Sequence, residues 1–206
     1  MKKFNLIISR GYMGLFYKEY TLATERMYLV ASHPKLARAV ADFIERNREI
    51  LQDVEPMRPS MFYTAEGCKT LLKLDYKDMM NGMDYRFYMI PKGSKKVIGT
   101  VGLGTVFFGS VKSGTISYKV DKDYRRMGYC TEAVEEVINF AFNTLQLHRI
   151  DSLVMPRNEK SLGVMKKFGF EQEGLSKKCL EINGKWEDHY RFALINDKVS
   201  AKQNYD

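Results

Sequence analysis

The chain has 206 residues, of which 45% are hydrophobic and 13% aromatic. These values exclude a disordered protein and predict one globular domain with a sizeable core. The formal net charge is +8, but the basic residues occur as scattered pairs instead of one stripe, so no nucleic-acid partner is expected. Attraction to an acidic substrate, cofactor or partner stays open.

Cysteine usage and apolar segments narrow the class further. Cys68, Cys130 and Cys179 lie far apart and form no Cys-x-x-Cys pair, so we expect neither a metal site nor a disulfide framework. The longest apolar run near the N-terminus, residues 6–8, is too short for a signal-peptide core or a membrane span. We therefore expect a cytoplasmic protein without a membrane partner.

The hydrophobic periodicity predicts a mixed α/β chain whose elements are separated by turn residues. The N-terminal half holds, in order, an extension of residues 1–20, a strand at 21–30, helices at 32–51 and 66–80, and strands at 85–90, 97–108 and 115–120. The C-terminal half holds a helix with apolar positions from 134 to 145, a strand at 149–155, a short helix before Gly169, a hairpin closed by Asn183-Gly184, and a polar tail at 198–206. This order predicts one domain over 21–197, with seven strands in a mixed sheet and helices on both faces.

The most informative stretch is the basic turn from Tyr124 to Ala133, which joins the strand at 115–120 to the next helix. Main-chain N–H groups at a helix start have no intrahelical partner, and the helix dipole adds positive charge, so this turn favours a phosphate or pyrophosphate. Arg125 and Arg126 add full charges, and Gly128 permits close approach. The alternative is an ordinary solvated helix start.

Two other phosphate-binding devices are excluded. The turn lacks the Gly-Lys-Ser/Thr ending of a P-loop. Gly99, Gly102 and Gly104 are flanked by strand residues, and no helix opens after them as a dinucleotide fingerprint requires. We interpret these three glycines as bends or bulges in a hairpin.

A second polar helix start follows the strand at 149–155. Asn158 is placed as an N-cap or loop donor, and Ser161 falls in the first turn of the short helix. Two adjacent parallel strands that each lead into a helix start form a cleft at their carboxyl ends, where ligands commonly bind. The alternative is that both residues serve only to begin the helix.

Together these segments resemble the GNAT acetyltransferases, most closely the branch of the ribosomal-protein N-terminal acetyltransferases RimJ and RimL. The family signature Gln/Arg-x-x-Gly-x-Gly/Ala falls on 125–130, and the branch's Gly-Tyr-Ala-Thr-Glu-Ala falls on 128–133 with Cys130 in place of alanine. Further matches to the branch are Asn158 with Ser161, Lys167-Phe168-Gly169-Phe170, Glu173-Gly174, Asn183-Gly184, Thr24-Glu25-Arg26 and Arg46-Asn47. The resemblance covers about 21–195 and implies the GNAT fold, a mostly antiparallel, splayed seven-stranded sheet.

The resemblance implies direct transfer of acetyl from acetyl-CoA to an amine within a ternary complex, without a metal. Main-chain N–H groups of the basic turn would hold the pyrophosphate, and one near Val120 would stabilise the oxyanion. Ser161 would protonate the departing thiolate, and Asn158 would hold the pantetheine amides. The residues expected to bind acetyl-CoA are Tyr118, Lys119, Val120, Arg125, Arg126, Met127, Gly128, Tyr129, Cys130, Thr131, Asn158 and Ser161.

The sequence assigns no general base. Relatives carry a glutamate about where Thr115 stands, or three places before the Asn-Gly hairpin, where this chain has Leu180. A hydroxyl cannot replace a carboxylate as base. Strand alternation points Glu181 the opposite way, which leaves Asp188, His189 or a water chain.

Cys130 carries a separate hypothesis. A thiol at a helix start beside arginines is expected to have a lowered pKa, to react faster than Cys68 or Cys179, and to form a mixed disulfide with coenzyme A. The alternative is a small residue that fills the last signature position.

The acceptor amine is left open by the sequence. A protein N-terminus is the first expectation, and a small amine such as an amino sugar, polyamine or amino acid is the second. A non-catalytic acyl-CoA-binding regulatory domain is the alternative from another class. Dimers are common among similar proteins, so a homodimer is a further possibility.

Overall fold

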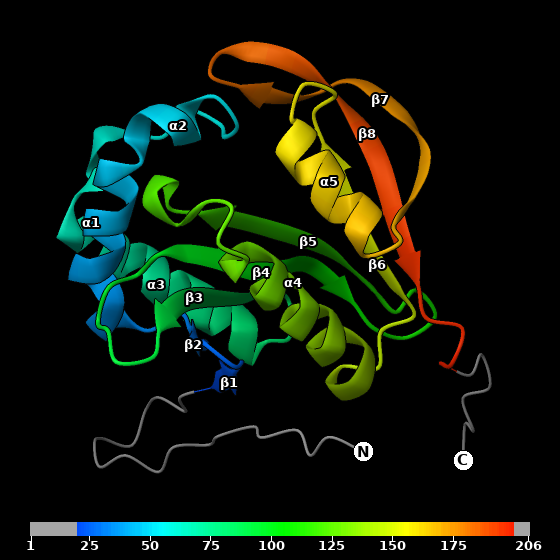
Figure 1. The fold of residues 1–206 in the computed structure, drawn as a ribbon, viewed down its shortest axis with the longest axis horizontal. Helices are drawn as coiled ribbons and strands as arrows, with labels where there is room; N and C mark the ends of the chain where they lie inside the picture. Colours follow the sequence, from blue (N-terminus) through cyan, green and yellow to red (C-terminus); the bar gives the residue numbers. More distant parts are fainter. Residues whose placement is uncertain (1–19, 200–206) are drawn as a thin grey trace.

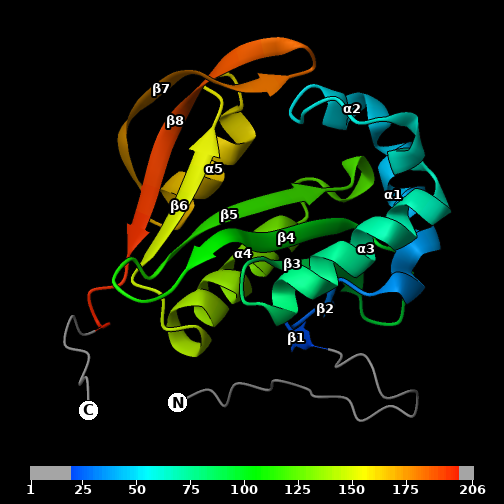
Figure 2. The ribbon, with the colours of Figure 1, turned by 180° about the vertical axis from the view of Figure 1, so that it is seen from behind.

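The computed structural model describes residues 20–199, which form one open sheet with helices on both faces (Figures 1 and 2). The sheet has eight strands in the order β1-β2-β3-β4-β5-β6-β8-β7, and the β5–β6 pair is its one parallel pair. The strands are β1 (Thr21–Ala23), β2 (Met27–Ala31), β3 (Tyr85–Pro91), β4 (Gly99–Phe107), β5 (Ser113–Val120), β6 (Arg149–Val154), β7 (Glu171–Ile182) and β8 (Lys185–Ile195). The predicted mixed, mostly antiparallel sheet with helices on both faces is confirmed, although it has eight strands where seven were expected.

The eighth strand arises because the strand expected at 21–30 is a hairpin. Residues 24–26 turn the chain between β1 and β2, and the Thr24 N–H donates to the Met27 carbonyl over 3.0 Å. The extension expected at 1–20 lies outside the described residues except for Tyr20, whose carbonyl accepts a hydrogen bond from the Ala31 N–H. Most of the expected polar tail, residues 200–206, also lies outside them.

Five α-helices among the described residues cover the sheet: α1 (Ala37–Arg46), α2 (Arg48–Gln52), α3 (Ala65–Met80), α4 (Tyr129–Asn139) and α5 (Glu159–Lys167). The single helix expected at 32–51 is interrupted at Asn47. Its side-chain amide donates to the Phe43 carbonyl and its Oδ1 accepts from the Lys122 N–H. Asn47 itself has a non-helical φ of −110° and ψ of 7°. The last turn of the central helix, Phe140–Thr144, is a π-helix.

Strand alternation gives the sheet two separate cores. Phe87 and Met89 of β3 pack on one face with buried residues of α4, among them Val134. Tyr88, between them, packs on the other face with α1 and α3, where Phe43 and others form the second core. No helix among residues 20–199 is long and apolar enough to cross a membrane.

The sheet divides between β5 and β6. These strands pair only from Ser113–Arg149 to Thr115–Asp151, after which β5 and β6 diverge toward their carboxyl ends (Figure 1). β6 stays paired with β8 along its length. The edge of β5 from Ile116 to Val120 therefore faces an opening.

Close backbone packing in β4 explains two of its glycines. A Cβ at Gly99 would lie 2.5 Å from the Lys119 carbonyl oxygen, and one at Gly102 would lie 2.6 Å from the Tyr85 carbonyl oxygen. Both positions lie within the paired strand, so they are not bends. The register shift occurs after Gly104, where a bulge was expected.

Candidate active site

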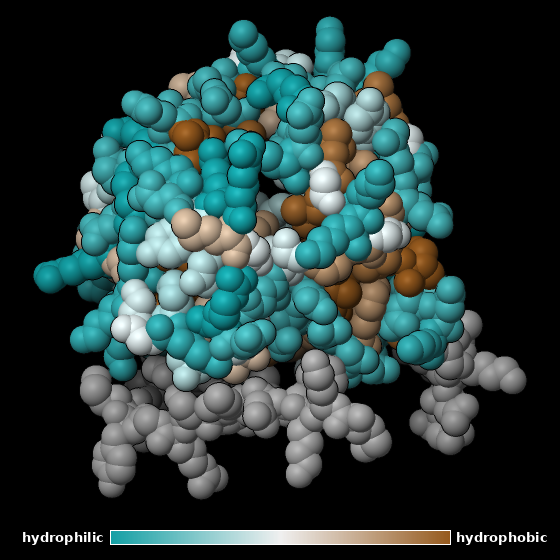
Figure 3. Space-filling model, in the orientation of Figure 1, coloured by the Kyte–Doolittle hydropathy of each residue, from teal (hydrophilic) through white to brown (hydrophobic). Residues whose placement is uncertain are grey.

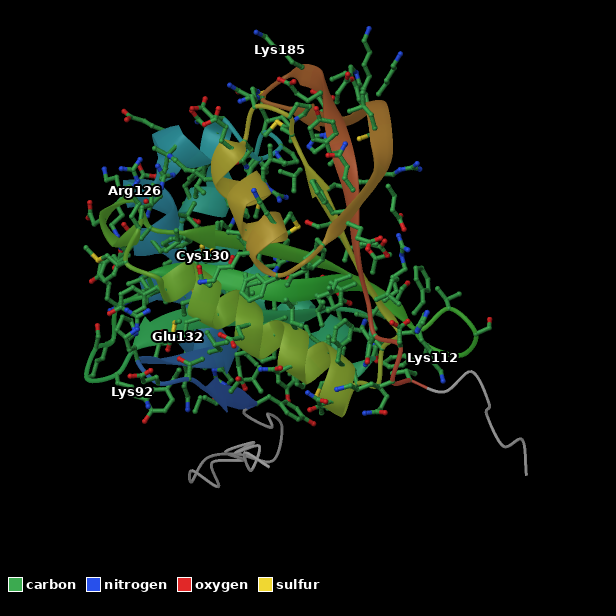
Figure 4. The ribbon with its side chains drawn as sticks, turned by 45° about the vertical axis from the view of Figure 1, so that its right-hand side comes forward. Lys92, Lys112, Arg126, Cys130, Glu132 and Lys185 are labelled. Carbon is green, nitrogen blue, oxygen red and sulfur yellow. The ribbon has the colours of Figure 1, made fainter. Side chains whose placement is uncertain are left out.

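The basic turn leads into α4 without a side-chain cap. Gly128, the N-cap residue, has a φ of +83°, in the region that favours glycine. The Glu132 N–H donates to the Gly128 carbonyl over 3.0 Å, which is the first hydrogen bond of the helix. The N–H groups of residues 129–131 therefore have no acceptor within the helix. Figure 4 shows Arg126 and Cys130 at this end of α4. An uncapped helix start with flanking arginines suits a diphosphate.

Arg26, from the β1–β2 hairpin, holds this turn in place. Its Nε donates to Glu132 Oε2 over 2.6 Å, and one terminal nitrogen donates to the Met127 carbonyl over 2.8 Å. The guanidinium lies 4.4 Å from the centre of the Tyr129 ring. A Cβ at Gly128 would come within 3.0 Å of Arg26. From the sequence, Arg26 was identifiable only as part of the Thr24-Glu25-Arg26 match, whereas in the structure it contacts both ends of the turn.

The second helix start faces the opening between β5 and β6. Asn158 is the N-cap of α5, as predicted, and its Oδ1 accepts from the Ser161 N–H over 3.3 Å. The Tyr118 hydroxyl donates to the Ser161 carbonyl over 3.4 Å. Burial raises the pKa of Tyr118, so its hydroxyl stays protonated at neutral pH. Three polar groups therefore meet at one end of the opening.

A cavity of about 350 Å³ joins this point to the α1–α3 face of the sheet. Strand register places Tyr88, Thr100 and Lys119 side by side, and Arg86 and Ser117 on either side of Gly102. These side chains, Gly102 excepted, line the cavity together with residues of α1, α3, the loop at 53–59, and Asn158 and Ser161. Figure 3 shows the surface hollowed beside α5.

The cavity contains paired charges that the sequence analysis missed. Lys119 Nζ lies 2.5 Å from Glu55 Oε1, and Arg86 lies 3.3 Å from Asp75. Burial lowers the pKa of Lys119 and raises that of Asp75. The position of Asp75 could have been noticed in the sequence, because a charged residue there falls between Leu72 and Met79 on the buried face of α3. Glu55 lies in a loop, where no such pattern marks it.

The base candidates named from sequence lie elsewhere. His189 is buried, with its Nδ1 3.1 Å from the Glu187 carbonyl, and Asp188 accepts from the Lys178 N–H over 2.7 Å. Within residues 20–199, the cavity lining includes neither of them, nor Thr115 or Glu181. They therefore stay unsupported as bases by the geometry.

The lowered pKa expected for the Cys130 thiol is contradicted, whereas its reactivity and the mixed disulfide with coenzyme A stay predictions. Its side chain packs against the core beneath α4, and this burial raises the pKa of the thiol to about 12. Loss of hydration disfavours a thiolate, and this burial is the cause of the raised pKa. The small-residue interpretation of this signature position fits the packing.

Comparisons with known proteins agree with this geometry. A family model described as "Acetyltransferase (GNAT) domain" matches residues 26–171. The probable N-acetyltransferase YjcK of Bacillus subtilis (strain 168) is 36% identical over 150 residues, which cover 73% of this chain and 83% of that protein. A ribosomal-protein-S5-alanine acetyltransferase from Vibrio fischeri is 33% identical with a TM-score of 0.83, over 87% of this chain and 98% of that one. Mycobacterium smegmatis RimJ in complex with CoA-disulfide is 25% identical with a TM-score of 0.80, over 86% and 90%.

Proposed function

Because this chain belongs to the GNAT family of N-acetyltransferases, in the branch of RimJ and RimL, we propose that it transfers acetyl from acetyl-CoA to the N-terminal amine of a protein. The observation that carries the proposal is the opening between β5 and β6, which leads into a cavity with polar groups of Tyr118, Asn158 and Ser161 at one end. The similar Vibrio fischeri enzyme is named for a ribosomal-protein alanine, which supports a peptide acceptor.

The main chain of β5 supports binding of the pantetheine arm. The Asp121 N–H donates to the Ile98 carbonyl over 2.7 Å, and hydrogen-bonded pairs alternate along an antiparallel ladder. Thr100 and Lys119 are therefore the next hydrogen-bonded pair, and the main-chain groups of Tyr118 and Val120 point away from β4 toward the opening. These groups are free to bond an extended ligand, and the Val120 N–H suits a developing oxyanion.

The remaining assignments follow the two helix starts. The amides of residues 127–131 hold the diphosphate with Arg125 and Arg126 beside it, and Asn158 orients the amides of the pantetheine arm. Ser161 gives its proton to sulfur. The bound acetyl-CoA supplies the activated acetyl group. Hydrophobic surface gathers between α4 and α5 (Figure 3), which suits the apolar parts of that ligand.

Calorimetry with acetyl-CoA tests the binding half of the proposal. We expect the wild-type chain to bind, and the double variant Arg125→Glu/Arg126→Glu to bind at least tenfold more weakly because two attractive charges become repulsive. The matched control is Lys69→Glu/Lys73→Glu, which reverses two exposed charges on α3 and should bind like wild type. Absence of wild-type binding, or equal affinity of the arginine variant, contradicts the proposal.

Release of coenzyme A in the presence of an amine panel tests the catalytic half. The panel contains peptides with varied first residues, including alanine, and an amino sugar, a polyamine and an amino acid. Fastest turnover on a peptide supports the proposal, and mass spectrometry should place the acetyl group on the α-amine. Preference for a small amine identifies the other acceptor class. Tight binding without turnover on any member indicates a regulatory domain and contradicts the proposed function.

A further inference from the structure

Glu55 is the cavity carboxylate that lies against β5. It belongs to the loop between α2 and the 3₁₀ turn at Ser60–Tyr63, and it reaches the strand through Lys119, whose Nζ lies 2.5 Å from its Oε1. Both side chains are largely buried, with 20% of Glu55 and 25% of Lys119 exposed. Lys119 directly precedes Val120, whose N–H faces the opening.

Strand alternation places this pair on the acceptor side of the sheet. Tyr118 points toward α5, where its hydroxyl meets Ser161, so Lys119 points to the opposite face, where the cavity lies. An amine that enters from the α1–α3 face therefore reaches the edge of β5 from the side that carries Glu55. Tyr118 and Ser161 approach the same edge from the side of the leaving sulfur.

Asp75 is the other carboxylate of the cavity, but its partner lies on a strand that does not border the opening. It pairs with Arg86 of β3, and β3 is separated from β5 by β4. Glu55 contacts β5 itself.

From this placement we infer that Glu55 is the general base of the reaction, which receives a proton from the acceptor ammonium, and that Lys119 is the positioning residue that holds it. The inference rests on the proposed function and adds the base that the sequence did not provide. Asp75 and Arg86 then belong to a more distant part of the acceptor pocket. Asp75 also bonds Ser32, which fixes it in that place.

The proton and electron balance of the step is complete. The Glu55 carboxylate accepts one proton from R–NH₃⁺, and the freed lone pair forms the N–C bond as the C–S bond breaks with its electron pair on sulfur. Ser161 protonates sulfur. Nitrogen loses its second proton to restore Ser161, and Glu55 releases the first to solvent through the cavity.

Charged side chains from several elements surround Glu55, and the pH dependence expected for its role comes from the acceptor amine. Lys119 of β5, Arg86 of β3 and Arg58 of the same loop are cationic, Asp75 of α3 is anionic, and Tyr88 of β3 is neutral. These are the charged and titratable side chains that face Glu55 in the cavity. An amine that is already deprotonated needs no base, so the contribution of Glu55 should fade above about pH 8, the ordinary pKa of an α-amine.

The test compares Glu55→Gln with the wild type on the panel amine that the wild type acetylates fastest. We expect acetyl-CoA affinity by calorimetry within twofold of wild type, kcat lower by about 100-fold at pH 7, and a deficit that narrows between pH 8 and pH 10. Glu49→Gln, the same change on the exposed face of α2, should behave like wild type. A flat deficit across that pH range, or a wild-type rate, overturns the inference.

The double variant Glu55→Gln/Lys119→Met separates a base from a structural ion pair. If Glu55 only neutralises Lys119, removing both charges should restore the rate. A general base predicts that the double variant stays slow with the same narrowing at high pH, and restored activity overturns the inference while the proposed function stands. Failure of the wild type to acetylate any amine would instead remove the proposed function and the inference together.

Discussion

Arg26 determines the shape of the turn at which α4 begins, although it lies about a hundred residues away in the sequence. Its contacts with Glu132, Met127 and Tyr129 fix the loop whose amides are expected to hold the diphosphate. Burial would raise the pKa of Glu132, but hydrogen bonds from Thr24 and Arg26 lower it overall, so this carboxylate stays charged and available to the guanidinium.

Arg26→Ala is therefore expected to weaken acetyl-CoA binding about tenfold, which corresponds to ~1.4 kcal/mol, because a charge-assisted bond that orders the loop is lost. Calorimetry measures the affinity, and a thermal melt should show the fold retained. The control is Arg48→Ala, which removes an arginine stacked 3.9 Å from the Tyr63 ring, outside the α4 turn. Equal affinities for the two variants would show that Arg26 does not order the site.

Cys130 provides a second prediction at the scale of one residue. Burial raises the pKa of Cys130 to about 12 and also raises that of Cys68, while Cys179 is half-buried on the outer hairpin. We expect iodoacetamide at pH 8 to label Cys179 first and Cys130 at least tenfold more slowly, because the thiolate is the reactive form. Peptide mapping over time measures the order. Cys130 labelling first would restore the thiolate hypothesis.

At the scale of the elements, the glycines of β4 determine how closely the strands approach. A Cβ at Gly99 would meet the Lys119 carbonyl at 2.5 Å and Met89 at 2.7 Å, so Gly99→Ala should push β5 outward beside Val120. We expect a loss of about 2 kcal/mol in the free energy of unfolding together with weaker acetyl-CoA binding. Urea unfolding and calorimetry measure the two effects.

The matched substitution is Gly163→Ala, at a helical position of α5 where a Cβ meets nothing within 4 Å. Alanine is favoured over glycine in a helix interior, so the free energy of unfolding of this variant should rise by about 0.5–1 kcal/mol. Opposite signs for the same chemical change would assign the Gly99 effect to backbone crowding. A stable Gly99→Ala variant with normal affinity would show that β4 and β5 can separate without harm.

The elements that sequence patterns predicted best are those whose signals are local. α3 begins after a Thr64 cap and carries its apolar residues at helical spacing, and the β7–β8 hairpin turns at Asn183-Gly184. The β1–β2 hairpin was missed because its turn contains no glycine, proline or asparagine. The break between α1 and α2 was missed because Asn47 is held by Lys122, a partner distant in sequence.

The same distinction applies to the site. The α4 turn and the Asn158–Ser161 start each lie within a few consecutive residues, so their positions were predictable from sequence. Glu55, Asp75 and Arg86 meet only because sheet register and loop packing bring them to one cavity. Residues brought together in this way have no characteristic spacing along the chain. The general base therefore could not be assigned from the sequence.

At the scale of the whole molecule, Asp121, which directly follows β5, joins the sheet to the helix α1. Its carboxylate is fully buried and accepts from Arg46 at the end of α1 over 2.6 Å. Burial alone would raise the pKa of Asp121, but hydrogen bonds from the Asp123 N–H and Arg46 bring it below its ordinary value. Asp121→Asn should therefore destabilise the fold by about 3 kcal/mol at pH 7 and lower Tm by about 10 °C.

The lowered pKa of Asp121 also determines how the stability difference between wild type and Asp121→Asn changes with pH. A carboxylate whose pKa is lower in the folded chain contributes stability above its unfolded pKa of about 3.9, and loses it as pH falls through the folded value. The wild-type advantage over Asp121→Asn should thus be constant from pH 5 to pH 8 and shrink on acidification below pH 4. Thermal melts across this range measure it, and an advantage that persists below pH 3 would exclude the ion pair as the cause.

Asp84 should show the opposite behaviour, because burial raises its pKa to about 6 against the smaller opposing effect of Arg86. Its charged form is disfavoured in the folded chain, so wild-type stability falls as pH rises from about 4 to 6. Asp84→Asn should accordingly stabilise the fold by about 1–3 kcal/mol above pH 7 and change little near pH 4. Two aspartates in one molecule then respond to the same substitution with opposite signs at neutral pH. Stabilisation by both substitutions would mean that burial outweighs the hydrogen bonds of Asp121, and destabilisation by both would mean that Arg86 outweighs the burial of Asp84.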